Sequence, residues 1–187
     1  MFAQHPDVSL AFGNLVAAEH DPTQSFVPIA DMRDFEVVHG TRAASLRGGA
    51  GANMAARRAL FDRIGGFDER IGPGSRFLAC EEYDLYYRAL AAGASVARDP
   101  SLVVIHHGAR PYAGGIGDEL LRSYCYAEGV VFGKHLRRHD RRMLRPAATV
   151  LSHDLVELVR PRGGRRRHAL ALFAAKWVGL LSGFLAY

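Results

Sequence analysis

Three carboxylates stand within four residues at Glu81, Glu82 and Asp84, inside the segment EEYDLYYRALAA. Acidic side chains at the start of a helix are stabilised by its unpaired N–H groups and by the helix macrodipole, so capping is one interpretation of the cluster. Three acids exceed what capping needs, and closely spaced like charges are typical of a general base or a metal site. Both interpretations stay open on these residues alone.

Two neighbouring histidines, His106 and His107, follow a short apolar run at residues 102–105 that predicts a buried strand. Successive side chains of a strand point to opposite faces, so one of the two imidazoles can face a pocket. A histidine at a strand end is either a structural group or a ligand, and the sequence leaves that choice open.

The elements expected to position these residues follow a strand, helix, loop, helix, strand order. An apolar run at residues 8–18 predicts a buried strand, and residues 21–34 predict a loop. Periodic apolar positions and capping residues predict helices over residues 57–64, 81–92, 118–136, 143–159 and 169–187. This order favours an α/β domain with helices added at its carboxyl-terminal side.

Composition limits the class of protein. The chain has 187 residues, of which 49% are hydrophobic and 23% charged, which excludes disordered, collagen-like and disulfide-scaffold classes. Two cysteines without metal-ligand spacing are expected to be thiols in a reducing compartment. The first residues lack a basic segment followed by a long apolar run, so a cytoplasmic location is expected.

Charge is unevenly distributed along the chain. The net charge is +5, but residues 134–187 carry 12 of the 24 Lys and Arg and 3 of the 19 Asp and Glu. Such a basic tail is typical of a segment that contacts phosphates of a membrane surface or a nucleic acid, or of a solvated helix face. The final apolar stretch could lie on a membrane, span it, or pack against protein.

An ordered series of motifs runs through the first two thirds of the sequence. It comprises GANMAARR (51–58), IGGFDE (64–69), GPGS (72–75) and EEYDLYYR (81–88), followed by Gly93, Pro100 and His106. Over residues 8–110 this series resembles the acceptor-side half of a family 2 glycosyltransferase of the GT-A fold. The resemblance implies an incomplete GT-A, Rossmann-like α/β domain over residues 1–115, followed by a basic helical tail over residues 116–187 that is expected to associate with a membrane.

The resemblance also implies catalytic roles. Glu82 stands where the family carries the general base, which deprotonates the acceptor hydroxyl as it attacks the anomeric carbon of the donor sugar with inversion. Glu81 and Asp84 are expected to support that base by binding the acceptor and by contributing negative charge around it. The loop at residues 72–75 is expected to border the acceptor.

Two further sets of residues are assigned by the same resemblance. Gly51 and Asn53 are expected on a strand that borders the donor sugar. His106 matches the histidine that completes a divalent-metal site, for Mg²⁺ or Mn²⁺, and His107 is the alternative ligand.

The chain departs from the family pattern in three ways. Glu82 replaces a residue that is commonly Asp, and no Asp-x-Asp motif occurs. The resemblance therefore implies that nucleotide binding and most metal ligands come from a missing amino-terminal half, with this chain either a truncated gene product or one half of a split one. Without the strands of the nucleotide-binding half, the sheet is expected to have an exposed edge. The absence of Gln-x-x-Arg-Trp favours transfer of single sugars over processive synthesis.

The sequence therefore predicts a glycosyltransferase, or a fragment of one. It would move a sugar from a nucleotide-diphosphate sugar to a saccharide or lipid-linked acceptor of the cell envelope, at the inner face of the cell membrane. The alternative is a non-catalytic module whose Arg-rich tail binds anionic lipid or nucleic acid. Nucleic acid is disfavoured because aromatic residues are not interleaved with the basic run.

Overall fold

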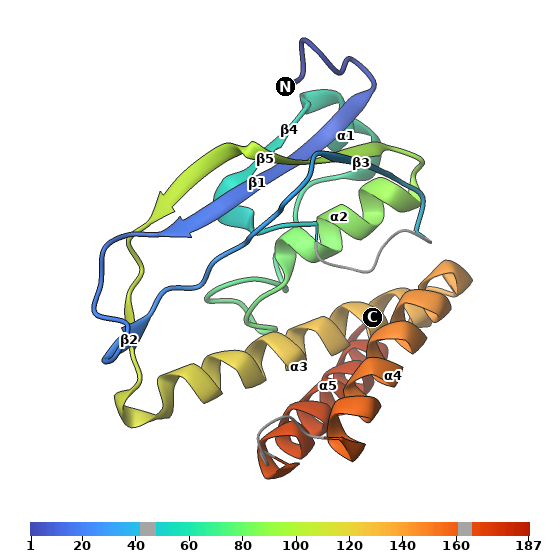
Figure 1. Ribbon diagram of the computed structural model, residues 1–187. Helices are drawn as coiled ribbons and strands as arrows, with labels where there is room; N and C mark the ends of the chain where they lie inside the picture. Colours follow the sequence, from blue (N-terminus) through green and yellow to red (C-terminus); the bar gives the residue numbers. More distant parts are fainter. Residues whose placement is uncertain (42–47, 161–165) are drawn as a thin grey trace. The chain divides into compact units, whose positions relative to one another are not determined.

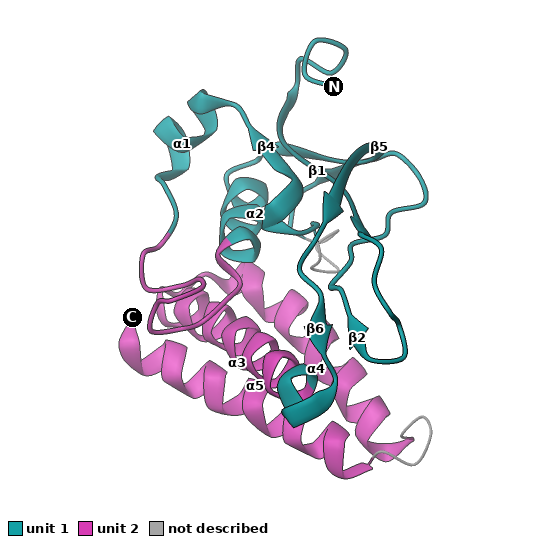
Figure 2. Cartoon of the chain, turned by 90° about the vertical axis from the view of Figure 1, so that its left-hand side faces the viewer, with its two compact units in different colours: residues 1–67, 82–117 teal, residues 68–81, 118–187 magenta. Residues whose placement is uncertain are grey.

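The computed structural model describes residues 1–41, 48–160 and 166–187. Within them the chain forms two compact units, which Figure 2 colours separately. The first unit contains residues 1–67 and 82–117, and the second contains residues 68–81 and 118–187. The chain therefore enters the second unit twice, first through a loop and later through its final helices.

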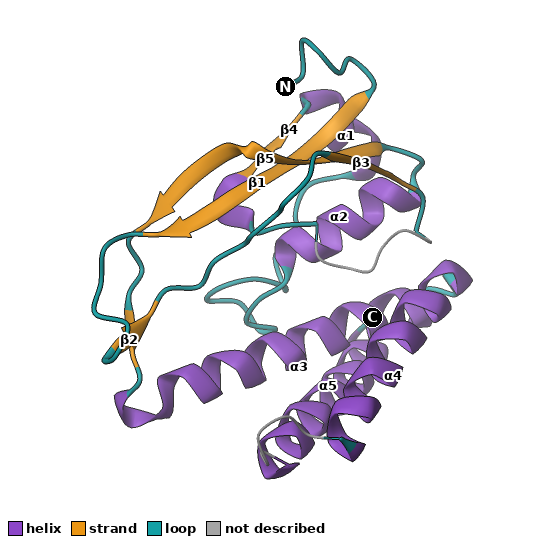
Figure 3. Cartoon of the chain, in the orientation of Figure 1, coloured by secondary structure: helices purple, strands orange, loops and turns teal. Residues whose placement is uncertain are grey.

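The first unit has a mixed α/β structure built on a four-stranded sheet (Figures 1 and 3). The strands, in the spatial order β3-β5-β1-β4, are β3 (Glu36–His39), β5 (Ser95–His106), β1 (Val8–Ala17) and β4 (Met54–Ala56). Strands β1 and β5 are parallel, whereas β3 and β4 run antiparallel to their neighbours. Among the described residues β3 and β4 each have a strand on one side only, so they form the two edges of the sheet.

Smaller elements surround this sheet. A two-stranded ribbon pairs β2 (Ser25–Phe26) with β6 (Arg110–Pro111). The helical elements are the 3-10 turns η1 (Gly51–Asn53) and η2 (Ala113–Gly115) and the helices α1 (Arg58–Ile64) and α2 (Glu81–Ala91).

Strand β1 is the centre of the first unit because its apolar residues are buried on both faces. Val8, Leu10, Ala11 and Phe12 are fully buried, as expected for a strand covered from both sides. Phe12 packs edge-on against Tyr86 of α2, with ring centroids 5.9 Å apart, so α2 covers one face of the sheet (Figure 1). Each large apolar side chain buried in this way contributes roughly 1.5–3 kcal/mol.

The second unit is helical beyond its loop. Its helices are α3 (Ile116–Arg137), α4 (Leu144–Val159) and α5 (Arg166–Ala186), with the 3-10 turn η3 (Arg141–Met143) preceding α4. Helix α3 contacts α5 through glycines: a Cβ added at Gly129 or Gly133 would overlap the α5 backbone, and one added at Gly179 or Gly183 would overlap the α3 backbone. Residue numbers rise together along both helices at these contacts, so α3 and α5 run parallel with their backbones in close contact.

The structure agrees with the expected α/β class and with all five expected helices, but it changes several elements. The strand expected at residues 102–105 extends over residues 95–106, and Val103, Val104 and Ile105 are exposed rather than buried. Strands β2 and β3 were not expected, because two or four residues give little periodicity and their pairing depends on distant partners. Pro161, Gly163 and Gly164 predict a break between the last two helices, and these residues lie outside the described ones.

Candidate functional site

The acidic cluster lies at the start of α2, where Glu81 is the first helical residue. Glu81 and Glu82 are half-buried, whereas Asp84 is fully buried. Residues two positions apart on an α-helix point roughly 200° away from each other, so Glu82 and Asp84 do not share a face. The three carboxylates therefore divide into two half-exposed groups and one core group.

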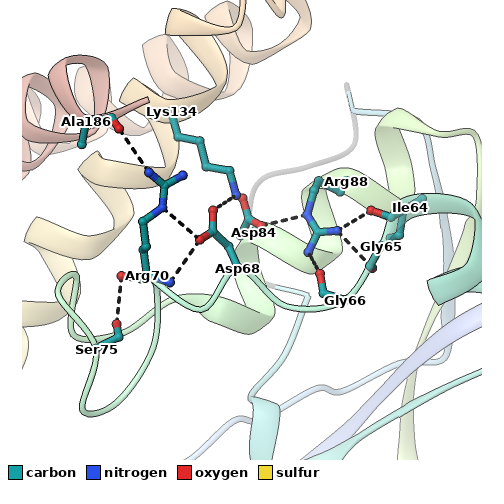
Figure 4. A network of polar contacts seen from close by, with 10 residues as sticks. All are labelled: Ile64, Gly65, Gly66, Asp68, Arg70, Ser75, Asp84, Arg88, Lys134 and Ala186. Carbon is teal, nitrogen blue, oxygen red and sulfur yellow. Dashed lines mark hydrogen bonds and ion pairs between the residues drawn. The ribbon is translucent and has the colours of Figure 1, made fainter.

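Asp84 is held by a cation on its own helix. Arg88, one turn later, places its Nε 2.8 Å from Oδ2 of Asp84. The same guanidinium donates to the carbonyl oxygens of Ile64, Gly65 and Gly66, at 2.8, 3.3 and 2.7 Å, as Figure 4 shows. This clamp ties α2 to the turn that ends α1. The i, i+4 spacing of Asp84 and Arg88 was the sequence signal for the pair.

Gly51 and Asn53 lie in the 3-10 turn η1 and not on a strand, which corrects the expectation for both; the strand β4 begins one residue later. The amide of Asn53 donates to the carbonyl oxygens of Asn14 in β1 and Leu102 in β5, at 2.8 and 2.9 Å. Gly51 is exposed.

The Asn53 amide sits at an irregularity between the two parallel strands. Their register slips between Gly13 and Asn14, where β5 advances from Asp99 to Val103. Pro100, in the extra segment, has no N–H to pair. A Cβ at Gly13 would overlap the carbonyl oxygen of Leu102, so glycine is needed there. Asn53 supplies the two donors that this interruption of the ladder requires.

His106 is the last residue of β5 and is half-buried. Its Nδ1 lies 3.0 Å from the carbonyl oxygen of Pro28. A carbonyl only accepts, so the proton of this hydrogen bond belongs to Nδ1, and in the neutral ring Nε2 carries the lone pair. Histidines that bind metals are commonly oriented by this kind of bond. His107 is exposed.

Asn53 and His106 are both connected to strand β5, but at different points. The amide of Asn53 donates to the carbonyl oxygen of Leu102, and His106 lies four residues later in the same strand, roughly 13 Å away if the strand is extended. Within the described part of the chain, no three His, Cys, Asp or Glu side chains are grouped so as to hold a metal ion. The described residues therefore offer one imidazole toward the expected metal and no complete ligand set.

The loop that precedes α2 has an unusual backbone. Leu78 and Cys80 have φ of 67° and 73°, a left-handed conformation that costs a residue other than glycine about 1–3 kcal/mol. Gly72 has φ of 128°, and a Cβ there would lie 3.3 Å from a carboxylate oxygen of Glu81. The loop at residues 72–75 thus lies against the Glu81 side chain. This strain was not predictable from residue type, because neither Leu78 nor Cys80 is a glycine.

The same loop is fixed to the final helices by charge, which sequence reasoning missed. The carboxylate of Asp68 lies 2.9 Å from Nζ of the buried Lys134 (Figure 4). Burial opposes the charge on Asp68, but hydrogen bonds from Tyr187, Lys134 and the Arg70 backbone outweigh it and lower its pKa to about 2. Arg70 donates to the carbonyl oxygen of Ala186 at 3.2 Å and stacks on the Tyr187 ring at 3.6 Å.

A second buried cation lies in the helical unit. Nζ of Lys176 on α5 lies 2.7 Å from Glu128 on α3 and 2.6 Å from Asp154 on α4. Burial disfavours the charged form, but the two carboxylates outweigh burial and raise the pKa of Lys176 above its ordinary value. This charged triad joins all three helices.

The basic tail and the last helix are partly described. Arg137, Arg138, Arg141, Arg166 and Arg167 are exposed, while Arg162 and Arg165 lie outside the described residues. By length and composition α5 could cross a membrane: its most apolar window has a mean hydropathy of 1.7 and is 17% buried. Both cysteines are thiols.

Comparison of the chain with protein-family models, with curated proteins and with solved structures finds no match.

Proposed function

We propose that this chain is the acceptor-side part of an inverting glycosyltransferase with Glu82 as its general base. The observation that carries the proposal is the division of the acidic cluster on α2. The buried Asp84 is paired with Arg88, which anchors the helix, while Glu82 is half-buried in the first turn. A general base needs this combination of a fixed backbone and a carboxylate within reach of a bound hydroxyl.

The reaction follows from these roles. Glu82 takes the proton of an acceptor hydroxyl, whose oxygen forms a bond to the anomeric carbon of the donor sugar. The bond from that carbon to the nucleoside diphosphate breaks, and the diphosphate leaves with the electron pair. Attack opposite the leaving group inverts the anomeric configuration. The proposed donor, a nucleotide-diphosphate sugar, and the proposed acceptor, a saccharide or lipid, are inferred from the motif series at residues 51–106. The strained loop beside Glu81 would border the acceptor.

A divalent metal would neutralise charge on the leaving diphosphate. Nε2 of His106 suits one position in its coordination shell, but the described residues do not complete a site. The remaining ligands would come from a nucleotide-binding half. Exposed apolar residues on β1 and β5, among them Val16, Val103 and Ile105, support the view that further polypeptide covers this end of the sheet.

The test supplies a nucleotide-binding half. The full chain is fused to, or mixed with, a nucleotide-binding half, and sugar transfer is measured with a panel of nucleotide-diphosphate sugars. Glu82→Gln is expected to lower kcat by about 10²–10⁴-fold and to leave donor affinity, measured by calorimetry, unchanged. Glu119→Gln removes an exposed carboxylate from α3 and should leave turnover unchanged. Equal turnover in Glu82→Gln and the unsubstituted chain would remove the assignment of the base.

A further inference from the structure

Beyond its first turn, helix α5 exposes its apolar side chains and buries its charged one, the reverse of a helix in a water-soluble bundle. Its buried residues are Lys176, Gly179 and Gly183. From residue 170 to residue 185 every exposed position is apolar, and these positions are Leu170, Ala174, Trp177, Val178, Leu181, Phe184 and Leu185. A helix on the surface of a soluble protein normally buries its apolar stripe and exposes its polar one.

The exposed positions form one continuous stripe. They recur at intervals of three and four residues, which places them on a single side of the helix. Leu181 and Leu185 are 58% and 85% exposed, so the stripe is open along its length. Apolar surface of this extent marks an interaction site rather than ordinary exposed residues.

Inside the unit, the packing is of the kind found where lipid surrounds helices. Close backbone contact through glycines joins α3 and α5, and the only charge on α5 after its first turn, Lys176, is turned inward to Glu128 and Asp154. Small residues at helix contacts and inward-facing, paired ions are typical of helices in an apolar environment.

Positive charge lies at one end of the stripe. Arg166 and Arg167 are exposed at the start of α5, and together with Leu158 and Leu170 they line a shallow hollow of about 340 Å³. Apolar side chains next to two guanidinium groups are complementary to an amphiphile with an anionic head and an acyl chain. Protein interfaces usually surround their apolar core with a polar rim, whereas the exposed positions of the stripe between residues 170 and 185 are all apolar.

We infer that the outward stripe of α5 is a docking surface for an anionic membrane, and that the helix lies in the plane of the lipid interface. Crossing the bilayer is disfavoured by α4, which contacts the middle of α5 through Asp154 and Lys176. His153, next to Asp154, is exposed, and so is Ser152. A transverse α5 would bring these polar side chains into the hydrocarbon, at a cost.

The experiment uses the full chain and phosphatidylcholine vesicles with or without phosphatidylglycerol. Trp177 is the single tryptophan and lies on the stripe, so its fluorescence should shift to the blue on binding. Leu181→Glu is expected to weaken binding to the anionic vesicles by tenfold or more, about the effect of withdrawing one leucine from an apolar phase. The control is Val103→Glu, a matched change at a residue of β5 that is 56% exposed, and it should change binding to the anionic vesicles by less than about twofold.

Further measurements on the same vesicles test the role of charge and the other possible occupants of the stripe. Arg166→Ser with Arg167→Ser should abolish the preference for anionic vesicles. Equal binding of Leu181→Glu and the unsubstituted chain, or no binding of the latter, would overturn the proposal. If the chain self-associates in buffer and Leu181→Glu abolishes this association, the stripe binds a second copy and the proposal is overturned. If the chain stays with the vesicles after an alkaline carbonate wash, α5 spans the bilayer and the interfacial placement is wrong. The inference concerns the helical unit alone, so sugar transfer can fail without affecting it.

Discussion

The buried triad of Lys176, Glu128 and Asp154 gives the most direct test of the helical unit. Lys176 is 3% exposed, whereas the side chains of Glu128 and Asp154 are 14% and 25% exposed. Lys176→Met keeps most of the volume and leaves two facing carboxylates without their cation. Breaking a buried ion pair from one side typically costs 3–5 kcal/mol. Water can reach both carboxylates in part, so we expect the lower value, about 3 kcal/mol.

This loss is measurable by urea unfolding followed by far-ultraviolet circular dichroism. In a chain of this size, 3 kcal/mol corresponds to a decrease in Tm of roughly 6–12 °C. Arg145→Met, an exposed change on α4, is the control and should move stability by less than about 0.5 kcal/mol. Adding Glu128→Gln and Asp154→Asn to Lys176→Met should recover most of the loss, because no charge then stays buried.

Either of two results would contradict the expected role of the triad. If Lys176→Met loses less than about 1 kcal/mol, the triad is not a buried charge cluster in solution. If the triple variant is as unstable as Lys176→Met, the loss comes from packing of the lysine stem and not from the uncompensated carboxylates.

Two other changes test separate contacts. Gly129→Ala should gain about 1 kcal/mol of helix propensity but lose more through overlap with the Lys176 backbone, a net destabilisation of about 1–2 kcal/mol by urea unfolding. Gly66→Ala, which meets no atom within 4 Å, should stay within about 0.5 kcal/mol; equal losses would contradict the close approach of α3 and α5. The pKa of Asp68 falls from 3.8 to about 2, so its stabilisation is present above pH 3.8 and lost as the pH falls toward 2. In Asp68→Asn the free energy of unfolding should depend less on pH between 3.8 and 2 than in the unsubstituted chain. The same pH dependence in both proteins would contradict the contact between Asp68 and Lys134.

Local signals predicted the first unit's main elements well. The apolar run from Val8 predicted β1, and the predicted stop at Gly93 agrees with its φ of 79° after α2. Strand β3 was missed because its four residues are a strand only through pairing with β5, whose partner residues lie about 60 positions later.

The start of α2 was predictable from the sequence, but the different surroundings of its three acids were not. Clustered acids indicated the start of α2, yet the burial of Asp84 depends on carbonyls of residues 64–66 that meet Arg88 in space. The structural duty of Asn53 depends on a register slip between two strands, which no local pattern encodes. The strain at Leu78 and Cys80 arises from the path of the loop and not from residue type.

The parallel pairing of β1 with β5 also has a consequence during synthesis on the ribosome. Strand β1 ends at Ala17 and its partner begins at Ser95, so at about 5–20 residues per second β1 emerges roughly 4–16 s before the strand that covers it. Throughout that interval Leu10 and Phe12 have no native neighbour on that side. The nascent chain should therefore need a holding chaperone, and slowing translation before codon 95 should increase its aggregation.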